Sequence, residues 1–407
     1  MRLFRQTITG RLFGNMTDIK VVVGANFGDE GKGLMTDYFC HQATSKNKSC
    51  IVVMSNGGAQ RGHTVNLLDG KKHVFKHFGS GTLVGAHTYC PSEFILNPME
   101  FVRELEDLQQ LFISPVVYVE ALCRWTTPYD MIINQIVEAA RGDKKHGSCG
   151  MGIWETVYRW TVQPDLFTIY EFNQLPFDRK VEHLKRIRDN WLPKRLKEHG
   201  VSDIPSEWKE IVASDFLIKN FIEDVRIFCV NTRRVVRPIL KSYDSVVFES
   251  GQGLLLDENM TFYGDNTTPS NTGIFNACKR INTQFDAANV EFCYVTRTYM
   301  TRHGAGRFLT ECDKASINSS MFDETNITNP FQDNLRYGEL NIDNLKLRVE
   351  NNLLNASGLR FDHTASIAVT HTNEHQFDYS QLKTKIIDGV YTSDSRTRDS
   401  VQVFTEF

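Results

Sequence analysis

The sequence predicts an α/β fold with a large, mainly parallel central sheet. Short apolar runs with the length of buried strands recur along the 407 residues, and segments with helical spacing of apolar residues separate them. This alternation is typical of parallel strands joined by crossover helices. Six apolar runs are the expected strands: residues 19–23, 50–54, 116–119, 245–249, 292–296 and 366–370.

Two of the expected helices have clear start signals. Asn97-Pro98 supplies a cap and a first-turn proline, and Pro128 opens a second helix that runs through Arg141. In each helix the apolar residues share one face. These residues are Phe101, Leu105 and Leu108 in the first helix, and Ile132, Ile133, Ile136 and Val137 in the second.

We expect a single large domain over residues 16–407. Length alone would allow two or three domains, but no repeat or low-complexity linker divides the chain. Residues 155–242 are dense in Trp, Phe, Leu and charged residues at helical spacing, which predicts a helical insertion. The first fifteen residues hold three arginines and no acidic residue, and Met16 offers a second plausible start. Residues 1–15 are therefore expected to be a dispensable extension.

Composition excludes several classes of partner. The formal net charge of −3 provides no basic field for nucleic acid, and no stretch approaches the roughly 18 apolar residues of a membrane helix. The nine cysteines include no C-x-x-C pair, so neither a zinc site nor a disulfide framework is indicated. We expect a cytoplasmic protein with reduced thiols that binds neither nucleic acid nor membrane.

The loops after the expected strands are rich in glycine, hydroxyl and cationic residues. Ligands of open α/β sheets bind beyond the carboxyl ends of the strands, where these loops meet. Together the loops offer many N–H donors and suit a ligand with several phosphates. Their sequences are SNGGAQRGHTV (55–65), HFGSGTL (77–83), HGSCGMG (146–152), SGQGLLLD (250–257), DNTTPSNTG (265–273) and TRHGAGRF (301–308).

The loop after the first expected strand, GANFGDEGKG (24–33), contains Gly31-Lys32 but also carries an acidic pair. A standard phosphate-binding loop requires G-x-x-x-x-G-K followed by Ser or Thr. Asn26 stands where its first glycine should be, and Gly33 stands in place of the hydroxyl residue. A carboxylate in such a loop could bind a metal ion or act as a base. The alternative is a strand-to-helix turn with a solvated acidic pair.

Taken in order from Val21 to Asp399, the loops resemble those of the adenylosuccinate synthetase family. The GDEGKG core at 28–33 is the most specific motif and is complete. Gly62-His63-Thr64 matches the end of an asparagine-alanine-glycine-histidine-threonine motif, from which Gln60-Arg61 depart. Further matches are Gly251-Gln252-Gly253 with Leu255-Leu256-Asp257, then Thr268, Ser270 and Asn271, and Arg302 with 304–306, where His303 replaces valine. The resemblance implies a large parallel sheet with P-loop-like nucleotide-binding loops and helical insertions.

The resemblance also implies a ligase. The 6-oxygen of a purine nucleoside monophosphate attacks the γ-phosphate of a nucleoside triphosphate, and L-aspartate then displaces the 6-phosphoryl group. Asp29 is implied as the general base, Lys32 as the cation on the γ-phosphate, and His63 as the group that stabilises charge on the leaving phosphate and the 6-oxygen. Gln252 would orient the purine. Asp29 and the carbonyl of Gly62 would share Mg²⁺ with the phosphates.

The same resemblance distributes the candidate residues among the three substrates. The triphosphate is expected at Asn26, Gly28, Glu30, Gly31, Lys32, Gly33, Gly62, His63, Thr64 and Asn373. The purine monophosphate is expected at Asp29, Ser148, Cys149, Arg159, Gln252 and Thr268, and L-aspartate at Arg302 and Arg336. A homodimer is implied, with Arg159 as the candidate that crosses to the partner's monophosphate. Cys149 replaces a family threonine and is not expected to be a nucleophile.

Three departures from the family concern substrate choice. His371-Thr372-Asn373 replaces a threonine-lysine-x-aspartate motif that reads guanine, so ATP or dATP is expected as the donor. NPFQDNLRYGEL (329–340) keeps only Arg336 and Gly338 of a glycine followed by four arginines. Ser148-Cys149 replaces the tandem threonines that hold the 5′-phosphate.

These departures resemble the bacteriophage branch of the family, which makes N6-succino-2-amino-2′-deoxyadenylate, the 2-aminoadenine precursor, from dGMP. Several phage members carry serine where Asp29 stands, so IMP with GTP is the alternative substrate pair. A phage-encoded enzyme would act in the host cytoplasm. A non-catalytic purine nucleotide sensor and a DNA-associated protein are the alternatives of other classes, and the complete set Asp29, Lys32, His63 and Gln252 favours the ligase.

Overall fold

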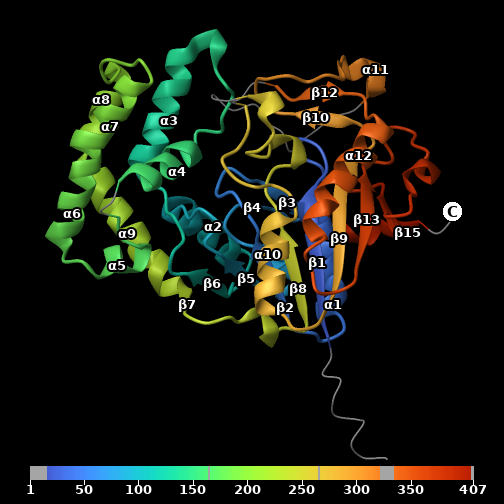
Figure 1. Cartoon of the computed structure of the whole chain (residues 1–407). Helices are drawn as coiled ribbons and strands as arrows, with labels where there is room; N and C mark the ends of the chain where they lie inside the picture. The colour runs from blue at the N-terminus through green and yellow to red at the C-terminus, as the bar shows by residue number, and fades with distance from the viewer. Residues whose placement is uncertain (1–15, 164–165, 265, 321–333, 405–407) are drawn as a thin grey trace, which may run out of the picture.

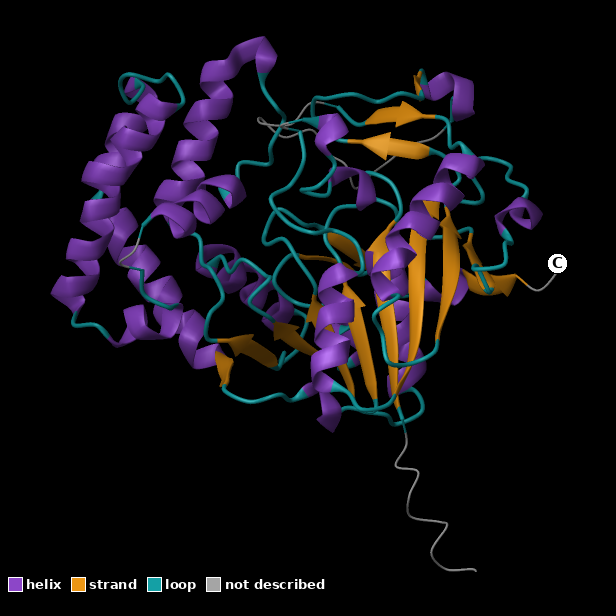
Figure 2. Cartoon of the chain, viewed as in Figure 1, coloured by secondary structure: helices purple, strands orange, loops and turns teal. Residues whose placement is uncertain are grey.

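The structure, a computed structural model, describes residues 16–163, 166–264, 266–320 and 334–404. The expected extension 1–15 and part of the segment 329–340 lie outside these residues. The largest element is a ten-stranded sheet that crosses the molecule (Figures 1 and 2). Its strands are β1 (Thr17–Gly24), β2 (Cys50–Met54), β5 (His87–Cys90), β6 (Val117–Glu120), β7 (Thr232–Val235), β8 (Ser245–Glu249), β9 (Ala288–Arg297), β13 (His363–Thr370), β14 (Gly389–Ser393) and β15 (Val401–Phe404).

The order of the strands is β15-β14-β13-β9-β1-β8-β2-β5-β6-β7, and every neighbouring pair is parallel except β14 with β15. The expected mainly parallel sheet is therefore confirmed. All six expected strands belong to it, and β2 and β8 have the expected bounds. The strands that the sequence did not indicate are β5, β7, β14 and β15. Residues 232–235 were expected to lie in the helical insertion and instead form the edge strand β7.

Helices cover both faces of the sheet (Figure 2). Those that pack on it or on one another are α1 (Lys32–Thr44), α2 (Pro98–Gln110), α3 (Pro128–Arg141), α10 (Phe275–Gln284) and α12 (Ile342–Leu353). Residues of β1 alternate between two cores, because successive side chains of a strand point to opposite faces. Val22 packs in the core that contains α1, α2 and α3, whereas Val21 and Val23 pack with α10 and α12.

The expected starts of α2 and α3 are confirmed. The side chain of Asn97 accepts a hydrogen bond from the N–H of Glu100, and Thr127 forms a capping box with Asp130. Each cap satisfies backbone donors that the first turn of a helix leaves unpaired. The faces expected to be apolar, including Leu108 and Ile133, are buried.

A group of helices lies beside α2 and α3, at the left of Figure 1. It consists of α4 (Ile153–Val162), α5 (Ile169–Gln174), α6 (Phe177–Arg186), α7 (Leu192–Glu198), α8 (Ser206–Ala213) and α9 (Asp215–Asn231). In this group α9 packs on α2, and α4 packs on α3. No helix within the described ranges combines the length and apolar character that a membrane crossing requires.

Two small antiparallel units complete the fold. One is the hairpin of β3 (His63–Asn66) and β4 (Lys72–Phe75). The other joins β10 (Met300–Arg302), β12 (Arg336–Gly338) and β11 (Glu311–Cys312), with α11 (Lys314–Asn318) beside it. Because β10 starts shortly after the carboxyl end of β9, this small sheet lies beyond the carboxyl edge of the large one (Figure 1).

Candidate active site

The loop between β1 and α1 has a left-handed backbone at three positions. The φ angles are 101° at Gly28, 59° at Asp29 and 94° at Gly31, a region that side chains disfavour. A Cβ atom added to Gly28 would lie 3.1 Å from the backbone of Gln252, and one added to Gly31 would lie 2.8 Å from the Thr370 side chain. Both glycines are therefore required for the loop to pack between the loop after β8 and the end of β13.

The N-terminus of α1 is open to an anion. Gly31 is the N-cap, no side chain caps the helix, and its first turn contains no acidic residue. The unpaired N–H groups and the positive end of the helix dipole favour a bound phosphate. Burial lowers the pKa of Lys32, although Glu30 and Asp29 oppose this. A bound anion would stabilise this buried ammonium group.

Glu30 folds back beneath the loop and away from solvent. Its Oε1 atom accepts a hydrogen bond of 2.7 Å from the N–H of Asn26, and its Oε2 atom is buried with no hydrogen-bond partner. Burial raises the pKa of Glu30 to about 7, although Lys32 and Asn26 oppose the shift. The two acidic residues of the loop thus differ in exposure: both line a cavity, but Glu30 is 2% exposed, whereas the Asp29 side chain is 30% exposed.

That cavity has a volume of about 170 Å³ and brings together most of the residues expected to bind the triphosphate. They come from the loop before α1, the start of β3 and the loop after β13. Asn26 lies under the loop instead, where its Nδ2 atom donates to Thr296 Oγ1 at 3.0 Å. The expected residues in the lining are Asp29, Glu30, Gly31, Lys32, Gly33, Gly62, His63, Thr64 and Asn373.

Arg297, at the carboxyl end of β9, holds the candidate base Asp29. Its Nε atom donates to the backbone carbonyl of Asp29 at 2.7 Å, and its Nη2 atom donates to Asp29 Oδ2 at 2.9 Å. His303 lies 4.0 Å from the same carboxylate oxygen. One guanidinium group therefore fixes both the strained backbone and the carboxylate of Asp29. We did not expect Arg297 from the sequence, where it follows the apolar run of β9 without any motif.

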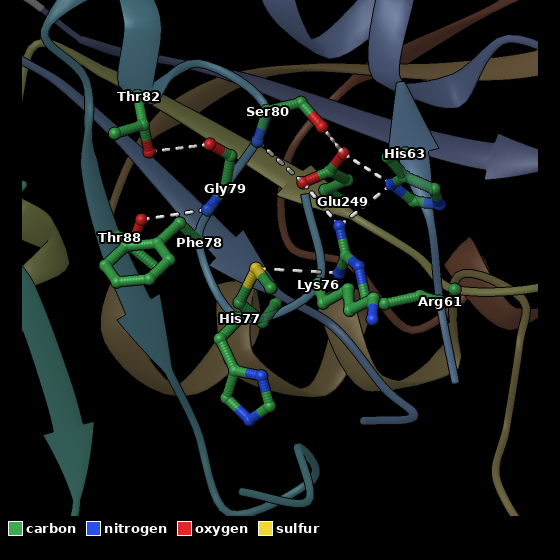
Figure 3. Close-up of polar contacts among 12 residues, drawn as sticks. Arg61, His63, Lys76, His77, Phe78, Gly79, Ser80, Thr82, Thr88 and Glu249 are labelled. Carbon is green, nitrogen blue, oxygen red and sulfur yellow. Dashed lines mark hydrogen bonds and ion pairs between the residues drawn. The ribbon is translucent and has the colours of Figure 1, made fainter. Parts of the chain in front are cut away.

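His63 belongs to a buried polar cluster centred on Glu249, the last residue of β8 (Figure 3). Glu249 Oε1 lies 2.6 Å from His63 Nδ1, and Glu249 Oε2 lies 2.6 Å from Arg61 Nη2. Ser80 adds its backbone N–H at 3.2 Å to Oε2 and its hydroxyl to Oε1. From the sequence, Arg61 was only a departure from the family motif, and neither Ser80 nor Glu249 was expected at the site.

Electrostatics in this cluster hold the carboxylate ionised and the imidazole neutral. Burial raises the pKa of Glu249, but Arg61 and His63 outweigh it and leave that pKa at about 2. Burial, reinforced by Arg61, lowers the pKa of His63 to about 4, and Glu249 only partly compensates. At neutral pH the His63 ring in the free protein is therefore uncharged and faces a carboxylate.

Gln252 has an unpaired amide oxygen beside the loop after β1. Its Oε1 atom is buried without a hydrogen-bond partner and would lie 3.2 Å from a Cβ atom on Gly57. Both polar side-chain atoms of Gln60 are also buried without partners, and its Nε2 atom would lie 3.0 Å from the same position. Unpaired buried amides are uncommon, so two that converge at Gly57 indicate a ligand with hydrogen-bond donors and acceptors.

The other residues expected at the monophosphate lie on separate loops. Ser148 Oγ accepts a hydrogen bond of 2.8 Å from Asn134 on α3. Burial raises the pKa of Cys149, which keeps its thiol protonated and argues against a nucleophile. Thr268 is buried in the loop after β8, where its N–H donates to the carbonyl of Leu256 at 2.8 Å. None of the three lines the 170 Å³ cavity.

The two arginines expected to bind aspartate already have partners within the protein. Arg302 lies over the Phe27 ring, 4.5 Å from its centroid, and donates to the Arg307 carbonyl at 2.5 Å. Burial lowers the pKa of Arg302 to about 10. Arg336 pairs with the carboxylate of Glu311 and donates to two carbonyl groups of the TRHGAGRF loop. In this conformation both guanidinium groups brace that loop.

The structure corrects the expectation for Arg159. Its side chain is fully buried on α4, where Nε and Nη2 each donate at 2.8 Å to the carboxylate of Asp130. Nη2 also donates to the carbonyl of Trp125. Because Asp130 belongs to the capping box of α3, the pair ties α4 to the start of α3. An arginine held in this way is not available to a partner's monophosphate.

The donor set for Mg²⁺ is one carboxylate and one carbonyl. Asp29 and Gly62 line the same cavity, and no group of three or more His, Cys, Asp or Glu side chains in the described ranges could hold a metal ion. Mg²⁺ usually keeps several waters and binds one or two carboxylates together with substrate phosphates. The residues present fit an ion of this kind.

Comparisons with known proteins point to one family. A model of the adenylosuccinate synthetase family matches residues 21–336. The adenylosuccinate synthetase of Halothermothrix orenii is 31% identical over 295 residues, which cover 72% of this chain and 65% of that protein. The synthetase of Mesoplasma florum is 28% identical over 72% of this chain and 64% of its own length. The matched part thus spans just under two thirds of these curated relatives.

Two solved structures share the fold over nearly the whole chain. The fully ligated adenylosuccinate synthetase of Plasmodium falciparum has a TM-score of 0.67 at 16% identity and covers 96% of this chain and 100% of that one. The succinoaminodeoxyadenylate synthetase of cyanophage S-2L, bound to dGMP and to dATP as an energy donor, has a TM-score of 0.60 at 13% identity and covers 95% of each chain.

Proposed function

Because the chain belongs to the adenylosuccinate synthetase family, we propose that it joins L-aspartate to the 6-position of a purine nucleoside monophosphate. The observation that carries this proposal is the placement of Asp29, Lys32 and His63 around one cavity at the uncapped N-terminus of α1. Phosphate binding alone has no need of a carboxylate in this position. A base beside a phosphate site suits phosphoryl transfer to a weak nucleophile.

In the proposed first step, Asp29 takes the proton from the ring nitrogen next to the 6-oxygen. The 6-oxygen then attacks the γ-phosphorus, the bond between that phosphorus and the β-phosphate oxygen breaks, and nucleoside diphosphate leaves. In the second step the amine of L-aspartate attacks the ring carbon, loses a proton, and inorganic phosphate departs. Lys32 and the N–H groups of α1 stabilise the charge on the transferred phosphoryl group, while Gln252 orients the purine.

Mg²⁺ held by Asp29 and the carbonyl of Gly62 would neutralise charge on the triphosphate. Arg297 keeps the Asp29 carboxylate in place through its hydrogen bond to Oδ2.

We propose dGMP as the purine acceptor. Guanine differs from hypoxanthine by an exocyclic amino group, and the two oxygens of Asp29 could accept from the ring N–H and that amino group together. The reduced arginine segment around Arg336 removes contacts that would favour a 2′-hydroxyl. The cyanophage synthetase with the same fold is described as bound to dGMP. The competing acceptor is IMP, because the curated relatives are adenylosuccinate synthetases.

The test is an assay with Mg²⁺, ATP, aspartate and a panel of dGMP, GMP and IMP. Aspartate-dependent release of ADP with the highest kcat/KM for dGMP supports the proposal. A preference for IMP would replace the acceptor but keep the ligase. Nucleotide binding without any aspartate-dependent ADP would contradict the ligase and favour a sensor.

We propose ATP or dATP as the phosphoryl donor, because Asn373 lines the cavity where a guanine-reading carboxylate stands in typical members. Charge-assisted hydrogen bonds contribute roughly 1.5–3 kcal/mol each. Asn373→Asp should therefore shift the preference toward GTP in competition assays. A wild-type preference for GTP would show that another residue reads the base.

We also propose a homodimer, as the family resemblance implies. Light scattering on the purified protein should give twice the chain mass of 46.6 kDa. Arg159 has no part in this proposal, because Asp130 holds it inside the subunit.

A further inference from the structure

A buried arginine, Arg61, precedes Gly62 and His63, two residues that line the cavity of the candidate phosphate site. The side chain of Arg61 is 0% exposed, and it occupies a position where the resembling family motif has alanine. Burying a guanidinium group is costly unless a carboxylate pairs with it. Glu249, itself 0% exposed, supplies that carboxylate. This arginine is therefore a specific feature of the chain, and its partner Glu249 also contacts His63.

The geometry of the cluster settles which groups donate. A guanidinium group can only donate, and an ionised carboxylate can only accept. The contact of 2.6 Å between His63 Nδ1 and Glu249 Oε1 thus requires a hydrogen on Nδ1. Arg61 Nη2 donates to the other oxygen of Glu249 at 2.6 Å. The 2.9 Å between Arg61 Nη2 and His63 Nδ1 is then the spacing of two donors that lie side by side on one carboxylate.

Two contacts from Ser80 keep the carboxylate in this orientation, and two further contacts hold Arg61 and the Ser80 loop in place. Ser80 donates from its N–H to Oε2 and from its hydroxyl to Oε1, so each oxygen of Glu249 accepts two hydrogen bonds (Figure 3). Arg61 Nη1 contacts Met54 Sδ at 3.5 Å. The Ser80 loop presses closely on β2, since a Cβ atom on Gly79 would lie 2.4 Å from Val52. The carboxylate therefore has little freedom to turn.

We propose that Arg61 is a positioning residue for His63. By occupying one oxygen of Glu249, it directs the other oxygen to His63 Nδ1–H and so fixes both the tautomer and the orientation of the ring. Nε2 is then the nitrogen on the side of the cavity that His63 lines. In either protonation state of the ring, Nδ1–H stays on Glu249 and Nε2 faces the ligand. The kinetic consequence rests on the proposed function, whereas the tautomer does not.

The test combines nitrogen NMR of the ring with kinetics. In protein labelled with ¹⁵N-histidine, with His63 assigned from the signals lost in His63→Gln, the wild type should carry its hydrogen on Nδ1. Arg61→Met should give a mixed or reversed tautomer and lower kcat by about 10–100-fold, an effect of the size seen when the partner that orients a metal-bound histidine is lost. The KM for the triphosphate should change by less than about threefold, since uniform binding is kept.

Arg61→Lys keeps one donor and should restore part of both readouts. Arg103→Met is the matched control, because Arg103 is 72% exposed on α2 and should leave both unchanged. Thermal unfolding checks each variant, and if Arg61→Met does not fold, the lysine variant decides. A wild-type hydrogen on Nε2, or an arginine variant with the wild-type tautomer and kcat, would overturn the proposal. If the protein lacks ligase activity, the tautomer still tests the positioning while the proposed function fails separately.

Discussion

The two ends of the candidate active site differ in how their polar groups are satisfied. At the phosphate end, the first turn of α1 has no side-chain cap and Glu30 Oε2 has no hydrogen-bond partner. At the end where we propose that L-aspartate binds, here called the aspartate end, Arg302 and Arg336 are bound to carbonyl groups, and Arg336 is also bound to Glu311. The first end is organised for a ligand before it arrives. The second end is stabilised by contacts that a ligand would have to replace.

This difference follows from the local backbone. At the phosphate end, left-handed residues at Gly28, Asp29 and Gly31 turn the chain so that N–H groups and side chains face one cavity. At the aspartate end, Arg336 lies on β12 and reaches across to the carbonyls of Gly304 and Gly306. Its guanidinium group thereby completes the hydrogen bonding of the TRHGAGRF loop. Substitutions at the phosphate end should therefore change the rate of the reaction, whereas substitutions at the aspartate end should change the conformation of the TRHGAGRF loop.

The largest effect is expected from Asp29→Asn. The amide can still accept from Arg297, so the loop and nucleotide binding should persist, but it cannot take a proton. Turnover should fall by about 10²–10⁴-fold, the usual contribution of a placed general base. Rates of ADP release compared with those of Asp69→Asn, an exposed control on the β3–β4 turn, measure this. If Asp29→Asn keeps more than about a tenth of the activity, the assignment of the base on this argument is wrong.

Lys32→Ala should follow closely. The buried ammonium belongs to the first residue of α1, and losing a preorganised charge at a reacting group typically costs about 10²–10³-fold in kcat. Lys71→Ala removes an exposed lysine, 61% accessible, and should have no effect. An equal loss of kcat in both variants would mean that only the net charge of the protein matters. Lys32 would then have no specific role at the transferred phosphoryl group.

Arg159→Ala tests an arginine outside the cavity, whose side chain is buried and paired with Asp130 in the same subunit. Removing it leaves Asp130 buried without its partner, which typically costs about 3–5 kcal/mol. Urea unfolding should show this loss of stability. If Arg159→Ala instead keeps wild-type stability but loses affinity for the monophosphate, then Arg159 contacts this ligand, and its assignment to a purely structural pair with Asp130 is wrong.

The sequence predicted the large sheet well, because its central strands are long apolar runs. It could not predict β5 or β7, because the four-residue segments HTYC and TRRV contain too few apolar residues to form a run. The same limit applies to the site. Residues in glycine-rich motifs, such as Asp29 and His63, were found, and the structure brings them to one cavity.

Single residues outside motifs were missed for a physical reason. Glu249 and Arg297 end apolar strands, and nothing in their neighbourhood reveals what they meet in space. Arg159 was misjudged because helical register decides whether an arginine points to a neighbouring subunit or into its own core. A single sequence does not show that α4 packs with this side chain against Asp130. In all three cases the role of the residue depends on a partner in another segment of the chain, which only the folded structure identifies.

The smallest expected effect, and the sharpest test of the comparison, comes from Glu311→Gln. Glu311 binds Arg336 through two contacts in the free protein, although its own side chain is 44% exposed. If Arg336 must release this carboxylate to bind the carboxylate of L-aspartate, then Glu311 competes with the substrate. Exposed ion pairs of this kind are worth about 0.2–1 kcal/mol, so Glu311→Gln should lower the KM for aspartate by about 1.5–5-fold. The kcat should stay the same, and Arg336→Met should raise the same KM.

Because Asp313 lies near Glu311 in sequence but is not paired with Arg336, Asp313→Asn is the matched control. A KM for aspartate that rises in Glu311→Gln would show that the Arg336–Glu311 pair holds the loop in its binding conformation, and that the aspartate end is organised in advance as well.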